Sequence, residues 1–146
     1  MKYNGVIQRK LALLDSQLVM LEKHLGTVTI EEFRESWMLR SMTERALQVC
    51  VEIVIDVCER IIALEGHGPV ASGSECVDKM VSLGLLPAQD PFKSMIRFRN
   101  FVVHQYEQIN PEILFDLARN KSNDFRQFIS AIDKLSNDGP TPQPNL

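Results

Sequence analysis

The chain has 146 residues, which suits one compact domain and is short for two. Its hydrophobic fraction of 45% and charged fraction of 24% are ordinary for a soluble globular protein. The net charge of −3 argues against a general nucleic-acid coat protein, which would be strongly basic, although a local basic cluster can still bind phosphate.

Targeting and redox features are absent from the sequence pattern. Charges break every apolar run before it reaches the length of a membrane span, and residues 1–4 do not lead into a signal-peptide core. Cys50, Cys58 and Cys76 lack Cys-x-x-Cys spacing, so the pattern indicates neither a disulfide framework nor a zinc site. We expect a cytoplasmic protein that does not enter the membrane and holds no metal.

The first predicted element is an amphipathic helix over residues 3–25. Its apolar residues recur at steps of three and four and form one stripe: Tyr3, Ile7, Leu11, Leu14, Leu18, Leu21 and Leu25. Gly26 ends this helix. Thr29, followed by Glu31 and Glu32, has the pattern of a helix N-cap, so a short helical piece is expected over residues 31–35.

The central predicted helix covers residues 37–64 and is apolar around most of its circumference, so neighbours must bury it on more than one side. One polar line remains along it, at steps of three and four: Arg45, Gln48, Glu52, Asp56 and Glu59. This line is either a solvated face with helix ion pairs or a functional surface.

Three further helical segments follow. Gly66 and Pro69 stop the central helix, and Ser74 is expected to cap a helix that Gly84 closes. Asp90-Pro91 starts the next helix, and Asn110-Pro111 starts the last one. That last helix runs to about residue 135, with a kink expected at residues 121–123, where cap-type residues gather.

No segment alternates with the period of a β-strand, and no internal repeat is present. The predicted fold class is therefore all-α: an antiparallel up-and-down bundle of about five helices over residues 1–136. Residues 137–146, rich in proline, are expected to form a disordered tail.

The chemistry concentrates in residues 98–106, which gather Arg99, Asn100, His104 and Tyr106. Histidine moves protons near neutral pH, and the guanidinium of arginine fits a pair of phosphate oxygens. An RNA strand supplies its own nucleophile, the 2′-hydroxyl. Cleavage then needs a base, a proton donor and charge stabilisation, and no metal.

Spacing constrains how these side chains can act together. On a continuous helix Arg99 and His104 lie about 140° apart, whereas Asn100 and His104 share a face. Arg97, seven residues before His104, also shares its face and competes with Arg99 as the phosphate ligand. Either the helix unwinds near Val103, or a second copy of the chain completes the site.

The motif region also contains a basic cluster, and its residues have a purely structural interpretation. Lys93, Arg97 and Arg99 form a basic cluster that could bind phosphate. Residue types alone are also compatible with Arg99 as a solvated helix residue, His104 as a partner of the helix dipole and Tyr106 as a packing residue.

The segment from Phe98 to Tyr106 resembles the Arg-x4-His-x-Tyr signature of the HEPN superfamily, and in particular its HepT-like toxin branch. A second block, from Glu44 through Gln48 to Asp56, is similar to the long central helix of HepT-like proteins. The likeness covers about residues 3–135.

The resemblance implies a HEPN-like bundle that forms a homodimer, with both copies of the motif lining a shared cleft. It implies the toxin of a toxin–antitoxin pair, a metal-independent endoribonuclease that cleaves RNA or tRNA without a cofactor. Arg99 would bind the phosphate, and His104 would be the general acid or base. Asn100 would orient the imidazole or hydrogen-bond the phosphate. Tyr106 would line the RNA site and receive AMP from a minimal nucleotidyltransferase, the antitoxin.

A noncatalytic helical module that binds a nucleotidyltransferase or its nucleotide is the alternative. A serine hydrolase is disfavoured, because no Gly-x-Ser-x-Gly turn is present. A metal-dependent nuclease is disfavoured as well, because the carboxylates lie on outward stripes and do not form converging pairs.

Overall fold

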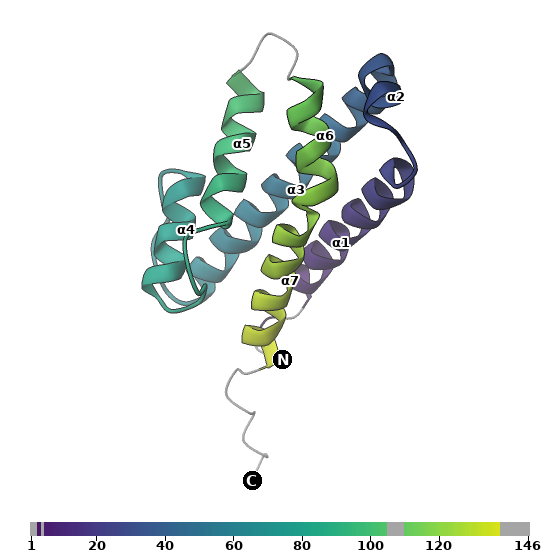
Figure 1. Ribbon diagram of the computed structural model, residues 1–146. Coiled ribbons are helices and arrows are strands. Elements are labelled where there is room, and N and C mark those ends of the chain that lie inside the picture. Colours follow the sequence, from purple (N-terminus) through teal and green to yellow (C-terminus); the bar gives the residue numbers. More distant parts are fainter. Residues whose placement is uncertain (1–2, 4, 105–109, 138–146) are drawn as a thin grey trace.

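The computed structural model describes residues 3, 5–104 and 110–137, and for residues 100–104 and 137 the backbone alone. The described part contains α-helices joined by short loops, with no strand (Figure 1). These helices are α1 (Val6–Leu25), α2 (Ile30–Glu35), α3 (Trp37–Leu64), α4 (Gly73–Ser82), α5 (Phe92–His104), α6 (Pro111–Asn120) and α7 (Ser122–Asn137).

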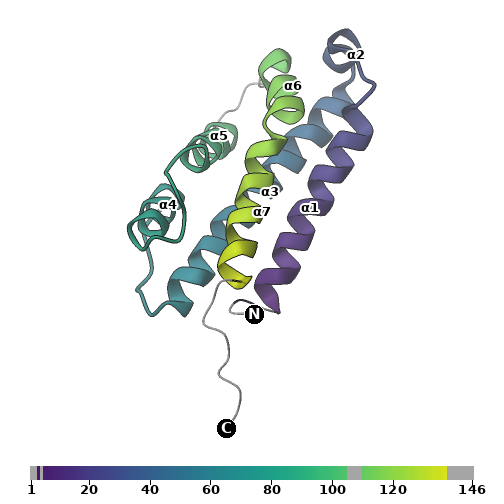
Figure 2. The same ribbon diagram turned by 60° about the horizontal axis from the view of Figure 1, so that its bottom comes forward.

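Helix α3 is the centre of the bundle and packs against α1, α2, α4, α5 and α6 (Figures 1 and 2). Its buried residues lie along most of its length: Thr43, Leu47, Cys50, Val51, Val54, Val57, Cys58, Ile61 and Ile62. The predicted stripe of α1 is buried as a whole, from Tyr3 to Leu25. The later helices therefore pack against the two longest helices, α1 and α3.

Side chains at the helix ends explain where several helices begin. Thr29 accepts a hydrogen bond from the backbone N–H of Glu32, whose carboxylate accepts from the Thr29 N–H, so both groups of a capping box are present. Ser36 then caps α3 by accepting from the Leu39 N–H at 3.1 Å. A six-residue corner helix thus joins α1 to α3, as predicted.

One predicted cap is wrong. Ser72, and not Ser74, caps α4 by accepting from the Glu75 N–H at 3.2 Å. The Glu75 carboxylate in turn accepts from the Ala71 N–H at 3.0 Å. A serine followed three residues later by glutamate satisfies two backbone donors, which Ser74 cannot do from inside the helix.

A close approach fixes the position of α4 against α3 and α5. A β-carbon at Gly73 would lie 2.9 Å from Cδ1 of Ile55 on α3 and 3.2 Å from Cγ2 of Ile96 on α5. Glycine is needed here because of contact, since any side chain would meet both isoleucines. Ile55 and Ile96 are therefore at the same level of the bundle.

The prediction of an all-α, antiparallel up-and-down bundle is confirmed. The structure describes more than the predicted five or so helices, because the corner helix α2 counts separately and the last helix is broken at Lys121 into α6 and α7. No helix in the described residues is long and apolar enough to cross a membrane. The predicted tail from residue 138 lies outside the described residues, and the domain boundary stays a prediction.

Two buried hydroxyls give a matched test of the core. Thr43 is fully buried and its hydroxyl has no hydrogen-bond partner among the described residues, whereas buried Ser136 donates to the Tyr3 carbonyl at 2.9 Å and accepts from Gln8. Thr43→Val should raise the free energy of unfolding by roughly 1 kcal/mol, because it removes an unpaired polar group. Ser136→Ala should lower it by roughly 1–2 kcal/mol. Urea unfolding measures both, and a destabilised Thr43→Val variant would contradict the assignment.

Candidate functional site

The candidate site begins with helix α5, which carries the motif. Phe92, Met95 and Ile96 are buried and fasten α5 to the bundle, and the ring of Phe92 lies 5.8 Å from that of Phe128 on α7. Helix α5 packs against α3 and α4. Its apolar side thus faces α3, and its remaining sides carry the charged residues.

The predicted basic cluster is only partly correct. Lys93 forms an ion pair with Asp78 on α4, with Nζ at 3.0 and 3.1 Å from the two carboxylate oxygens. This contact links α5 to α4 and gives Lys93 a carboxylate partner within the bundle. Arg97 is exposed and Arg99 is half-buried.

Asn100 and His104 lie in α5, but their side chains are outside the described part of the structure, and Tyr106 lies in the segment 105–109, which is outside it entirely. The backbone still bears on the expected unwinding. The backbone of α5 is helical through His104, so the described part of the chain shows no unwinding before that residue. Positions 99 and 104 are therefore about 140° apart around the helix and about 7.5 Å apart along it.

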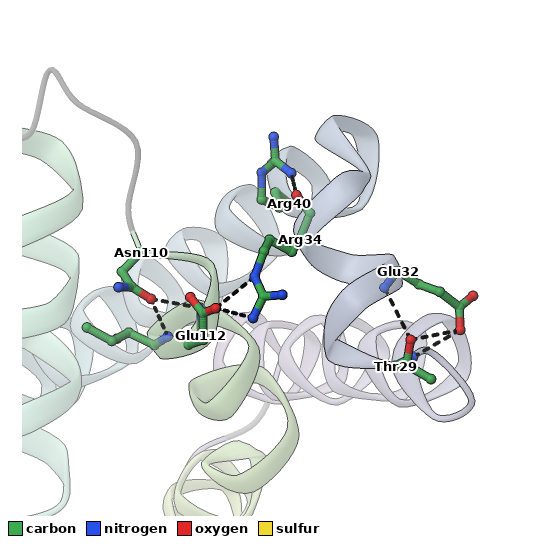
Figure 3. A network of polar contacts seen from close by, with 7 residues as sticks. Thr29, Glu32, Arg34, Arg40, Asn110 and Glu112 are labelled. Carbon is green, nitrogen blue, oxygen red and sulfur yellow. Dashed lines mark hydrogen bonds and ion pairs between the residues drawn. The ribbon is translucent and has the colours of Figure 1, made fainter.

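A polar network anchors the chain immediately after the motif (Figure 3). Asn110 caps α6 by accepting from the N–H groups of Glu112, at 2.8 Å, and Ile113, at 3.3 Å. Arg34 on α2 donates to the Glu112 carboxylate through Nε at 2.8 Å and also through Nη2. The Arg34 guanidinium lowers the pKa of Glu112 below its usual range. This contact ties the start of α6 to α2.

The network extends into the corner between α1 and α3. Arg40 on α3 donates to the Arg34 carbonyl, and the capping box of Thr29 and Glu32 lies on the other side of the same short helix (Figure 3). The two described helices that flank residues 105–109 are therefore fixed, because α5 packs on α3 and α4 and α6 is tied to α2. Sequence reasoning missed the Arg34–Glu112 pair, because 78 residues separate its members.

A cavity of about 510 Å³ lies between α5 and the junction of α6 and α7. Leu47, Val51, Met95 and Phe98 form apolar parts of its wall, and Asp90, Ser94, Lys121 and Asp124 are among the polar residues at its lining. The cavity thus lies between Ser94, Met95 and Phe98 on α5 and the end of α6 with the start of α7.

The three cysteines are free and buried in the core. Burial raises the pKa of the Cys50 thiol to about 12 and that of Cys76 to about 11, and it raises the pKa of Cys58 as well. A thiol that stays protonated is a poor nucleophile. In the described residues no group of three histidine, cysteine, aspartate or glutamate side chains is arranged to hold a metal ion.

The fold and the motif helix together define a class: an all-helical HEPN-type bundle with an Arg-x4-His sequence on one helix. Residues 14–132 match the family model described as ribonuclease HepT-like. The chain therefore belongs to the ribonuclease HepT-like family, and the resemblance predicted from the sequence is confirmed.

Individual relatives agree with this assignment. The chain is 26% identical over 131 residues to the mRNA nuclease HepT of Shewanella oneidensis, which covers 88% of this chain and 97% of that protein. A solved structure of the tri-AMPylated HEPN toxin of S. oneidensis in complex with MNT antitoxin is 25% identical, with a TM-score of 0.81 and coverage of 90% of this chain and 99% of that one. YutE of Bacillus subtilis, a cytosolic protein of unknown function, shares the fold at 18% identity, with a TM-score of 0.75 and 92% coverage of each chain.

The raised thiol pKa values predict how the cysteines react. Alkylation of the folded protein with iodoacetamide at pH 8 should leave all three thiols unmodified, whereas all three should react in urea. Since the folded pKa values lie above the ordinary value of 9.0, the unfolded chain loses these protons first. The free energy of unfolding should therefore fall as the pH rises through 9 to 11. Mass spectrometry counts the adducts, and a Cys50 adduct on the folded protein at pH 8 would contradict the assignment.

Proposed function

We propose that this chain is the toxin of a toxin–antitoxin pair and a metal-independent endoribonuclease. One observation carries the proposal: a chain of the ribonuclease HepT-like family presents Arg99 and His104 on one uninterrupted helix, in the Arg-x4-His order. The relative named mRNA nuclease HepT supports RNA as the substrate. Since messenger and transfer RNA are cytoplasmic, the proposal assigns the protein to the cytoplasm.

The reaction uses a nucleophile that the substrate carries. A base removes the proton of the RNA 2′-hydroxyl, the 2′-oxygen attacks the adjacent phosphorus, and the bond to the 5′-oxygen breaks as that oxygen receives a proton. The products are a 2′,3′-cyclic phosphate and a 5′-hydroxyl. His104 is the proton-transfer residue, because its imidazole exchanges protons near pH 7.

Arg99 is assigned to the phosphate. Its guanidinium binds two oxygens of the scissile group and stabilises the negative charge that grows on them in the transition state. Asn100, one turn before His104, orients the imidazole or donates to the phosphate. Arg97 and Tyr106 extend the RNA-binding surface on either side.

A homodimer accounts for the separation of the two catalytic positions. On one helix, positions 99 and 104 face different directions, so one copy does not aim both side chains at the same phosphate. In a dimer, Arg99 of one copy and the partner's His104 can meet at a shared cleft. The catalytic site then lies at the interface between the two copies.

The partner proposed for this toxin is a minimal nucleotidyltransferase antitoxin. Support comes from the S. oneidensis HEPN toxin, whose structure is described as tri-AMPylated and in complex with MNT antitoxin. In this chain the proposed acceptor is the phenolic oxygen of Tyr106, which displaces pyrophosphate from ATP and becomes AMP-tyrosine. The added nucleotide is bulky and anionic, so it repels RNA from the cleft.

Alanine variants separate the roles of the motif residues. His104→Ala should lower the rate of RNA cleavage by about 10²–10⁴-fold, and Arg99→Ala by about 10²–10³-fold, because each removes a transition-state interaction. Both variants should still fold. The measurement is cleavage of total RNA and tRNA in EDTA, followed by analysis of the 5′ fragments for 2′,3′-cyclic phosphate.

Arg97→Ala is the matched control, since Arg97 lies on the same helix and is exposed. It should weaken RNA binding without abolishing cleavage. An inactive Arg97→Ala beside an active Arg99→Ala would move the phosphate site to Arg97. Intact RNA with every variant, together with nucleotide binding by the unaltered protein, would instead identify a noncatalytic module.

Tyr106→Phe tests the modification site separately from catalysis. The variant keeps the ring but lacks the acceptor oxygen, so it should cleave RNA and should not incorporate radiolabelled AMP in the presence of the nucleotidyltransferase and ATP. Its toxicity in cells should persist when the antitoxin is co-expressed. Label on Tyr106→Phe equal to that on the unaltered protein would show that the acceptor lies elsewhere.

A further inference from the structure

The cavity of about 510 Å³ beside α5 takes no part in the proposed reaction. Protein interiors are packed almost without voids larger than a water molecule, so a space of this size between α3, α5 and the junction of α6 and α7 is an exception. Its volume lies within the range of about 300–1,000 Å³ that is typical of small-molecule pockets. Its lining residues decide which class of molecule it fits.

The buried wall of the cavity is apolar and is built by every helix around it. The apolar lining residues are Leu47 and Val51 from α3, Met95 and Phe98 from α5, Leu117 from α6 and Phe125 from α7. Phe98 and Leu117 are half-buried and the other four are buried. The two phenylalanine rings offer surfaces on which a planar apolar group can pack. This wall therefore fits the apolar body of a ligand.

Three charged residues line the cavity where it meets solvent, and we call them the charged rim. Asp90 precedes α5, Lys121 follows α6, and Asp124 lies in the first turn of α7. Asp90 and Lys121 are exposed, and Asp124 is half-buried. Within the described residues none of the three forms an ion pair, and Asp90 accepts a hydrogen bond from the Ser94 hydroxyl at 2.9 Å. Two carboxylates and one ammonium give the rim a net negative charge.

We propose that this cavity binds an apolar amine, with its aromatic or aliphatic body on the buried wall and its single ammonium group at the carboxylates of Asp90 and Asp124. The buried wall supplies affinity through the apolar area that it removes from water. The rim supplies selection, because a monocation complements its net charge and an anion of the same shape meets two carboxylates. This inference does not depend on the proposed nuclease, since Arg99 does not line the cavity.

An RNA segment or a nucleotide fits this cavity less well than an apolar amine does. Each carries phosphate charge, which the carboxylates of Asp90 and Asp124 repel. No arginine, the side chain best suited to bind a pair of phosphate oxygens, lines the cavity. The cavity and the motif therefore serve ligands of opposite charge.

Three naphthalene derivatives of nearly the same shape test the charge preference. Naphthylmethylamine, naphthylmethanol and naphthoate share one apolar body and are cationic, neutral and anionic at neutral pH. Isothermal titration calorimetry on the full-length protein should give the amine the lowest dissociation constant, about three- to tenfold below that of the alcohol, because two partly exposed carboxylates face its charge. Naphthoate should bind most weakly. Tighter binding of naphthoate than of the amine, or no saturable binding of the amine, would overturn the proposal.

Two variants of the charged rim should change amine binding in opposite directions. Asp124→Asn removes one carboxylate at nearly constant shape and should raise the dissociation constant of the amine about threefold. Lys121→Gln removes the competing ammonium and should lower the same constant by a similar factor. Binding of the alcohol serves as the control and should change by less than about twofold. Equal shifts for the amine and the alcohol would show that the rim does not select for charge.

A cavity-filling variant tests where the ligand lies. Leu117→Trp places an indole in the cavity and should raise the dissociation constant of the amine about tenfold or more. The matched control is Leu85→Trp, the same change at a half-buried residue that lines a different hollow, between the α4–α5 loop and α7. It should leave amine binding unchanged.

Circular dichroism shows whether each variant is folded. If Leu117→Trp does not fold, the two rim variants carry the test. Unchanged amine binding by a folded Leu117→Trp variant, or an equal loss in Leu85→Trp, would place the ligand outside this cavity and overturn the proposal.

Discussion

Burial of α3 on most of its circumference is the constraint on which the rest of the structure depends. Five other helices pack against it, so its apolar residues decide where each of them can lie. The contact of Gly73 with Ile55 and Ile96 then sets the levels of α4 and α5 along it. The side chains of Arg45 and Glu59 on α3 remain exposed after this packing.

Local patterns made most of this fold predictable. The stripe of α1, the corner after Thr29, the bounds of α3 and the break near Lys121 all depend on residues within one or two turns of each other, where helical periodicity and capping chemistry act. The pairs Lys93–Asp78 and Arg34–Glu112 were not predictable in this way. They join helices whose relative positions follow from packing and not from spacing, and many other carboxylates were equally available.

The candidate site was likewise predictable from the sequence only in part. The identities and spacing of Arg99, Asn100, His104 and Tyr106 could be found in the sequence, and the family match supports their interpretation. Spacing alone left open whether the helix unwinds at Val103, since nothing in that local sequence breaks a helix. The backbone of α5 is helical through His104, and the proposed site shared by two copies agrees with that helix.

The cavity beside α5 has a thermodynamic consequence. Phe92 packs against Phe128 at the start of α5, but Ser94, Met95 and Phe98 on the same helix line a cavity of about 510 Å³. Helix α5 therefore loses fewer packing contacts than α3 would if it separated from the bundle. Its free energy of local opening therefore lies below that of global unfolding.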